Sequence, residues 1–248
     1  IDCAACHLDK GALLTTRTPS EAGLRAHPLR HSDALGQPEA CARCHQFNVP
    51  LEFHDPVVLG DQPMQDTLAE WRRSEAPAHG KRCQTCHMAS GSHDIWGGHD
   101  VELLRKTVRV EFAPSPGDAG APGWDAVLVA RGAGHRVPTG DPFRRFELLY
   151  CPTWPCERPG LARFGREFQD EGRRWRLVRD YAAPPEPGPG EARSLPRHLR
   201  ASSAPGSFDW ELHYRTDEPG IDGLAPGDVD TLVSRGHQAP GADADAGR

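Results

Sequence analysis

The chain is poor in several features that whole classes of protein require. No run of apolar residues approaches the ~20 that a membrane-spanning helix needs, so we expect no transmembrane segment. Lysine- and arginine-rich runs are also missing and the formal net charge is −6, which argues against a nucleic-acid partner. Hydrophobic residues make up only 37% of the chain, beside 26 glycines and 24 prolines. So lean a composition predicts that something other than side chains fills part of the interior.

Cysteine, by contrast, is abundant and regularly spaced. Six of the eight cysteines belong to Cys-x-x-Cys-His motifs, which recur at intervals of about 40 residues. In a c-type haem site the two thiols bond to the vinyl groups of the porphyrin, and the histidine that follows them binds the iron. Each motif therefore predicts one covalently attached haem c, three in all. The predicted sites consist of Cys3, Cys6 and His7, of Cys41, Cys44 and His45, and of Cys83, Cys86 and His87.

Two other kinds of site also use a Cys-x-x-Cys pair: a zinc ribbon and a thioredoxin-like redox pair. Both compete where no histidine follows the second cysteine, but a histidine follows every one of these three pairs. Zinc would also leave an uneven count, because three pairs supply six thiolates whereas a tetrahedral site takes four. The sequence therefore favours three haems over zinc.

The remaining cysteines, Cys151 and Cys156, enclose four residues and lack a following histidine. We expect a disulfide between them, with two free buried thiols as the alternative. A disulfide fits an oxidising compartment, and bacteria attach haem c outside the cytoplasm. Since the first motif begins at Cys3, we further expect a processed, exported product in the periplasm or outside the cell.

The second ligand of each iron has to come from elsewhere in the fold. Met88 adjoins a motif histidine and cannot reach the far side of the same haem, which leaves Met64 as the only other thioether. Histidines are numerous, so we expect bis-histidine haems, with lower potentials than His/Met ligation gives. About three of the ten spare histidines are needed, and the others are ordinary surface or hydrogen-bonded residues. The ten are His27, His31, His54, His79, His93, His99, His135, His198, His213 and His237.

Local sequence favours three of these histidines as distal iron ligands. His93 and His99 lie in residues 91–100, a glycine-rich run behind the third motif where backbone can approach a flat macrocycle. His135 lies in residues 132–140, a turn-rich run between two strand-like runs, and as a ligand it would tie two domains together. The alternative for His135 is a hydrogen bond within its own turn.

A fourth candidate precedes the second motif. Pro28 favours an extended backbone for His27, so His27 ranks slightly ahead of His31, which is the reserve candidate. Either of the two could reach the first haem or a neighbouring one.

After residue 100 the haem motifs stop and period-two patterns begin, so we expect a domain boundary near Asp100. The predicted class is α+β, with a multihaem module of short helices and loops over residues 1–100 and an all-β, Ig-like sandwich over residues 101–248. Within the sandwich, residues 182–206 are rich in proline and glycine and predict a long surface loop. The predicted strands cover residues 107–112, 125–130, 143–150, 173–178 and 208–214.

Four runs carry a resemblance to a known family. They are residues 64–74 (MQDTLAEWRRS), 83–88 (CQTCHM), 93–100 (HDIWGGHD) and 134–142 (GHRVPTGDP). Across residues 1–150 the chain resembles a bacterial multihaem c-type cytochrome family related to the cytochrome c-554 group. The resemblance implies a small multihaem module followed by a β-sandwich, with electron transfer as the usual role. This chain has three haem motifs where cytochrome c-554 has four, so no role of a fourth haem carries over.

Together these observations predict electron transfer by the three haems, in a carrier or conduit that meets redox partner proteins. The haems must lie close together, because about 90 residues of chain can hardly keep three of them apart. The alternative is an oxidoreductase acting on a small nitrogen or sulfur compound, which needs one haem with an open distal face. Self-assembly, or membership of a larger complex, is a further hypothesis, in which a histidine binds a neighbour's iron.

Overall fold

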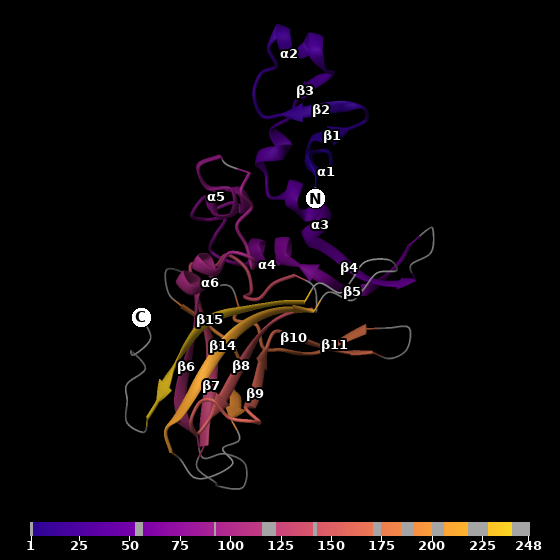
Figure 1. The fold of residues 1–248 in the computed structure, drawn as a ribbon. Helices are drawn as coiled ribbons and strands as arrows, with labels where there is room; N and C mark the ends of the chain where they lie inside the picture. The colour runs from indigo at the N-terminus through magenta and orange to yellow at the C-terminus, as the bar shows by residue number, and fades with distance from the viewer. Residues whose placement is uncertain are drawn as a thin grey trace.

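The computed structural model consists of a segment of short helices and hairpins, followed by a β-rich part that lies at one end of it (Figure 1). We call residues 2–100 the haem-motif segment. His54, one of the spare histidines, lies outside the described residues. These are residues 2–52, 57–91, 93–115, 123–140, 143–170, 175–184, 191–199, 206–217 and 228–239.

Short helices carry the three cysteine motifs. The first motif forms the whole of α1 and the third the whole of α5, whereas the second ends α3. Helix α1 begins where the Asp2 carboxylate accepts a hydrogen bond from the Ala5 N–H at 3.1 Å, which satisfies one of its free N–H groups. The helices are α1 (Cys3–His7), α2 (Glu21–Ala26), α3 (Glu39–His45), α4 (Thr67–Arg73), α5 (Cys83–His87) and α6 (Val101–Thr107), with 3-10 turns η1 (Asp33–Gly36) and η2 (Ala89–Gly91).

The haem-motif segment also holds five strands, beyond the short helices and loops expected for it. The strands are β1 (Leu8–Asp9), β2 (Ala12–Thr15), β3 (Leu29–His31), β4 (Gln46–Glu52) and β5 (Val58–Asp66). The first three form one sheet and the last two an antiparallel pair. Lys10 and Gly11 reverse the chain between β1 and β2 with positive φ angles of 48° and 78°. The first three strands are too short to show a period-two pattern in the sequence.

Two four-stranded sheets form a sandwich around one core in the β-rich part. Its strands are β6 (Val108–Ser115), β7 (Gly123–Arg131), β8 (Arg144–Cys151), β9 (Gly160–Phe164), β12 (Glu191–Arg193), β13 (Arg197–Leu199), β14 (Phe208–Asp217) and β15 (Asp228–Gln238). In one sheet β7 pairs with β6, β12 and β13, and the other has the order β15–β14–β8–β9. Leu128 and Leu148 are fully buried between the sheets, and the Phe112 and Trp210 rings meet across them. The Ig-like arrangement of strands stays a prediction.

Two sequence expectations about this part are wrong. Residues 182–206 were expected to be one surface loop, but β12 and β13 lie within them, pair with β7 and bury Leu199. Each is three residues long, too short for a periodic signal. Residues 173–178 were expected in the sandwich, but their described part belongs to β11 (Trp175–Asp180), which pairs with β10 (Arg166–Asp170) in a separate hairpin.

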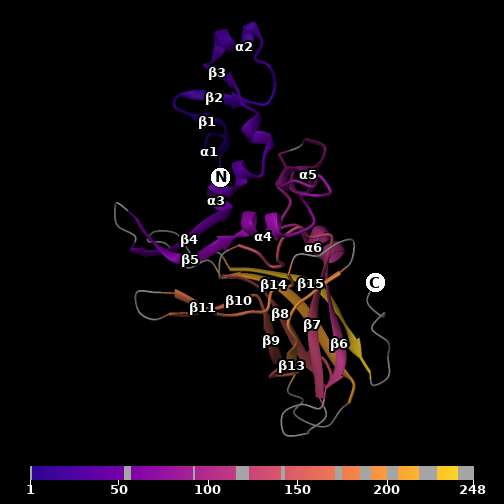
Figure 2. The same ribbon diagram turned by 180° about the vertical axis from the view of Figure 1, so that it is seen from behind.

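Helices α4 and α6 lie between the cysteine-motif helices and the sandwich in both views (Figures 1 and 2). The β10–β11 hairpin reaches the haem-motif segment, where Arg166 donates to the Met64 carbonyl at 2.8 Å and the Leu177 N–H to the Gln62 side chain at 3.0 Å. At the end of β8, Cys151 forms the expected disulfide with Cys156. In the described part of the chain, every helix is too short or too polar to serve as a membrane span.

Candidate haem-binding site

None of the six motif cysteines is buried, and none of them forms a disulfide. Cys3, Cys6, Cys44 and Cys86 are exposed, and the other two are half-buried. Cysteines three residues apart on a helix lie one turn apart on the same face. Each motif therefore presents two reachable thiols side by side, which is what attachment to two vinyl groups of one porphyrin requires.

Each motif histidine is held by a hydrogen bond at Nδ1. The acceptors are all oxygen atoms, so Nδ1 carries the proton and Nε2 keeps a free lone pair. This is the tautomer in which an imidazole binds a metal, with the second nitrogen fixing the orientation of the ring. The bonds join His7 to the Leu14 carbonyl (2.9 Å), His45 to the Gln65 amide oxygen (3.1 Å) and His87 to the Trp96 carbonyl.

Two of the motif histidines face a second histidine ring. The ring centroids of His7 and His93 lie 5.9 Å apart. Those of His87 and His135 also lie 5.9 Å apart, with their planes inclined by 15°. His93 follows the third motif in the sequence, yet it lies opposite the first.

This spacing fits one iron between each pair of rings. An imidazole nitrogen lies about 2 Å from its metal and about 1 Å from its own ring centroid, so two axial histidines have centroids about 6 Å apart. The two observed separations agree with that value. The residues present therefore fit a six-coordinate haem iron at the first motif and at the third.

His135 is oriented in the same way as the motif histidines. Its Nδ1 lies 2.8 Å from the Arg136 carbonyl, which again leaves Nε2 free. Burial lowers the pKa of His135 to about 4, the hydrogen bond to Arg136 opposes that shift, and the nearby His87 and His45 add to it. The ring is therefore neutral at physiological pH, and the neutral imidazole is the form that binds iron.

The second and third motifs lie side by side. The thiols of Cys41 and Cys83 lie close enough to influence each other, since Cys83 lowers the pKa of Cys41 to about 7 and Cys41 raises that of Cys83. Gln84 ties the same two motif helices together, because its side-chain amide donates to the Leu35 and Gln37 carbonyls ahead of α3, at 3.0 and 2.8 Å. Haems attached to these two motifs would therefore have neighbouring edges.

No family model matches the chain, and no curated protein matches it either. Among solved structures, the chain is similar to a penta-heme cytochrome c552 from Thermochromatium tepidum. The likeness has a TM-score of 0.56 at 18% identity, and covers 96% of this chain and 76% of that one. The chain has the fold of a multihaem cytochrome. At this identity the comparison concerns the fold alone, and likeness to the cytochrome c-554 group stays a resemblance.

Within the cytochrome fold, the other predicted ligands lie apart from the motif histidines. Ring contacts with a motif histidine are found among the described residues for His93 and His135, and not for His27 or His99. His27 ends α2, and His99 is exposed in the turn before α6. His31, the reserve candidate, has its Nε2 3.5 Å from the Asp33 carboxylate. Ligation by these three stays a prediction.

Two residues of this site were not singled out from the sequence. Gln65 accepts the hydrogen bond that orients His45, and Glu70 binds the loop that carries His135. Both lie in the run from residue 64 to 74 that carries the family resemblance. The sequence offered no signal for Glu70, because its burial becomes visible only in the folded chain.

Proposed function

We propose that this protein transfers electrons through three haem c groups attached at its three cysteine motifs, in the periplasm or outside the cell. The observation that carries the proposal is the pairing of His7 with His93 and of His87 with His135 at the spacing of one iron. A fold shared with a multihaem cytochrome supports it.

In this proposal, different residues of the chain attach the porphyrins and bind the irons. The motif cysteines anchor each porphyrin, while His7, His45 and His87 bind the irons from one side. His93 and His135 bind from the other side at the first and third motifs. When bound, each haem supplies a one-electron redox couple, and two strong axial histidines keep its coordination unchanged in both oxidation states.

Contact between the second and third motifs supports a conduit. Gln84 of the third motif binds the chain just ahead of α3, so haems attached at Cys41 and Cys83 would have neighbouring edges, and short separations favour electron transfer. Such a conduit also needs a redox partner protein, or a second copy of the chain, to deliver or accept electrons.

The first prediction tests this function directly. The purified holoprotein should exceed the polypeptide mass by three haem units after denaturation, and its oxidised resting state should be low-spin at the first and third motifs. Reduction by a one-electron donor in a stopped-flow instrument should reach all three haems, and a one-electron acceptor should reverse it.

A mass excess of two haems or fewer would contradict the proposal. A strong high-spin signal in the resting protein, together with turnover of a nitrogen or sulfur compound, would favour the oxidoreductase alternative instead.

A further inference from the structure

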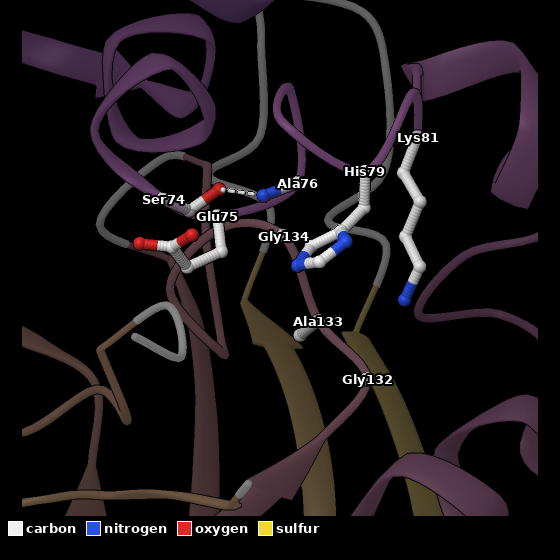
Figure 3. Close-up of a pocket in the computed structure, with 8 residues that line it drawn as sticks. All are labelled: Ser74, Glu75, Ala76, His79, Lys81, Gly132, Ala133 and Gly134. Atoms are coloured by element: carbon white, nitrogen blue, oxygen red, sulfur yellow. Dashed lines mark hydrogen bonds between the residues drawn. The ribbon is translucent and has the colours of Figure 1, made fainter. Parts of the chain in front are cut away.

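A loop of the β-rich part reaches the haem-motif segment and packs against α4. The loop, residues 132–140, follows β7 and carries His135. Its Gly134 lies so close to this part of the chain that an added Cβ would come within 3.4 Å of the Trp71 ring in α4 and within 2.8 Å of the side chain of Ala76, which follows α4. Figure 3 shows the start of this loop running beneath the chain that follows α4.

Glu70 is the side chain of α4 that binds this loop most fully. It is only 3% exposed. Its Oε2 accepts hydrogen bonds from the Arg136 backbone N–H at 3.1 Å and from the Thr139 hydroxyl at 2.9 Å. Thr139 also meets the Thr67 hydroxyl of α4 at 2.8 Å. One carboxylate of α4 thus holds the loop at the residue after His135 and again three residues further on.

The end of β11 and the residues just after it also hold this loop. Val137 and Ala183 exchange two backbone hydrogen bonds of 2.9 and 2.8 Å. The Arg136 guanidinium pairs with Asp180 at 3.3 Å and lies 4.0 Å from Glu70. The backbone bonds at Val137, the Arg136–Asp180 pair and the bonds to Glu70 together restrict movement of the loop that carries His135.

A buried carboxylate is costly unless its oxygens are satisfied. Burial raises the pKa of Glu70, while the bonds from Thr139 and Arg136 and the nearby charges of Arg166 and Arg136 oppose the shift. An apolar side chain would fill this space without such a cost. What Glu70 adds is two directed hydrogen bonds to the loop, and hydrogen bonds to a charged acceptor are the stronger kind.

We propose that Glu70 is a positioning residue, which holds the loop so that the His135 ring stays opposite His87 as the distal ligand of the third haem. The inference rests on the proposed function, since it takes His135 as an iron ligand. Glu70 touches neither ring; it acts through the Arg136 backbone N–H and the Thr139 hydroxyl, which both follow the ligand in the chain.

The second prediction uses three holoprotein variants. Glu70→Ala removes both hydrogen bonds, so one iron in three should gain a high-spin component, and cyanide should bind that iron about tenfold faster, as the loss of a charged hydrogen bond implies. Glu70→Gln keeps an acceptor oxygen in place and should restore the low-spin spectrum and the slow cyanide reaction. His135→Ala removes the proposed ligand itself, so its spectrum is the reference for an iron without that ligand. Mass spectrometry should find three covalent haems in every variant.

Glu75→Ala is the matched control, because Glu75 is an exposed carboxylate near the same loop. It should leave both the spin state and the cyanide rate unchanged. Should Glu70→Ala fail to fold, Thr139→Val removes one of the two donors and should raise the cyanide rate in the same direction.

Two results would overturn the inference. If His135→Ala is high-spin while Glu70→Ala and Thr139→Val match the unaltered protein, Glu70 has no positioning role. If His135→Ala itself stays low-spin, the ligand assignment fails and the inference with it, although three haems by mass would still support electron transfer.

Discussion

At the scale of single residues, a hydrogen bond at Nδ1 with Nε2 left free makes a histidine ring available to an iron. The three motif histidines and His135 give Nδ1 to an oxygen and keep Nε2 free. His213 is the contrast, because its two nitrogens meet Asp230 at 2.7 Å and Glu211 at 3.2 Å. With both nitrogens engaged, His213 is a structural residue of the sheet surface. The count of histidines in the sequence does not distinguish these two roles.

The third prediction compares two histidines of one short run. His93 faces the ring of His7, whereas His99 contacts no motif histidine ring in the described structure. His93→Ala should therefore convert one iron in three to a high-spin or water-bound form and leave three covalent haems in place. His99→Ala is the control and should keep the low-spin spectrum, as measured by absorption and electron paramagnetic resonance. A change in the His99 variant alone would reverse the assignment.

At the scale of elements, two parts of the chain that are far apart in sequence share one loop. Residues 132–140 follow β7 and contact both α4 and the residues just after α4. Glycine is needed at Gly134 because an added Cβ would lie 2.8 Å from the Ala76 side chain. A methyl group at that position must push the loop away from α4, and with it His135.

The fourth prediction follows from that contact. Gly134→Ala should lower the free energy of unfolding by about 1–3 kcal/mol, the usual cost of overpacking. It should also give a high-spin component at one iron, because the displaced loop carries a proposed ligand. Denaturant unfolding and the absorption spectrum measure the two effects.

Gly36→Ala is a fitting control for this variant, since a Cβ there has no neighbour within 4 Å. Equal unfolding curves for the two glycine variants would show that the close contact at Gly134 does not affect stability.

At the scale of the whole molecule, the two ends of the protein differ in how they are stabilised. The sandwich has a continuous core that includes Phe146, Phe164 and Leu212, all fully buried. In residues 2–37, by contrast, no side chain is buried. So short a segment without a core of its own needs another group to cover its apolar side chains. A haem at the first motif would supply that surface.

The fifth prediction removes that haem. A double variant, Cys3→Ala with Cys6→Ala, should lose covalent attachment at the first motif and expose residues 2–37. Hydrogen exchange of their amides should accelerate by at least about tenfold, while exchange in the sandwich strands stays slow, because local stability follows local burial.

Replacing Cys151 and Cys156 by alanine gives a control that also removes two cysteines. It should leave exchange in residues 2–37 unchanged. Slow exchange of these residues in the variant without the first haem would show that the segment folds without it.

The sequence by itself determined the number of predicted haems and their attachment points. Covalent attachment depends on local sequence alone. Each motif places both thiols and the histidine within five adjacent residues, so the site can be identified without the tertiary structure. The Cys151–Cys156 disulfide was predicted from a short spacing, β6 and β14 from alternating patterns, and β7 from a nearly all-apolar run; each of these signals lies within a few adjacent residues.

Only the tertiary structure decided which spare histidines meet a motif histidine. His93 is six residues from His87 but faces His7, whereas His135 faces His87 from 48 residues away. No spacing rule encodes such pairs, because a distal ligand is carried to its place by the packing of whole elements. Burial of Glu70 and the contact of Gly134 with α4 arise in the same way, since each depends on a surface that exists only after two distant segments have met.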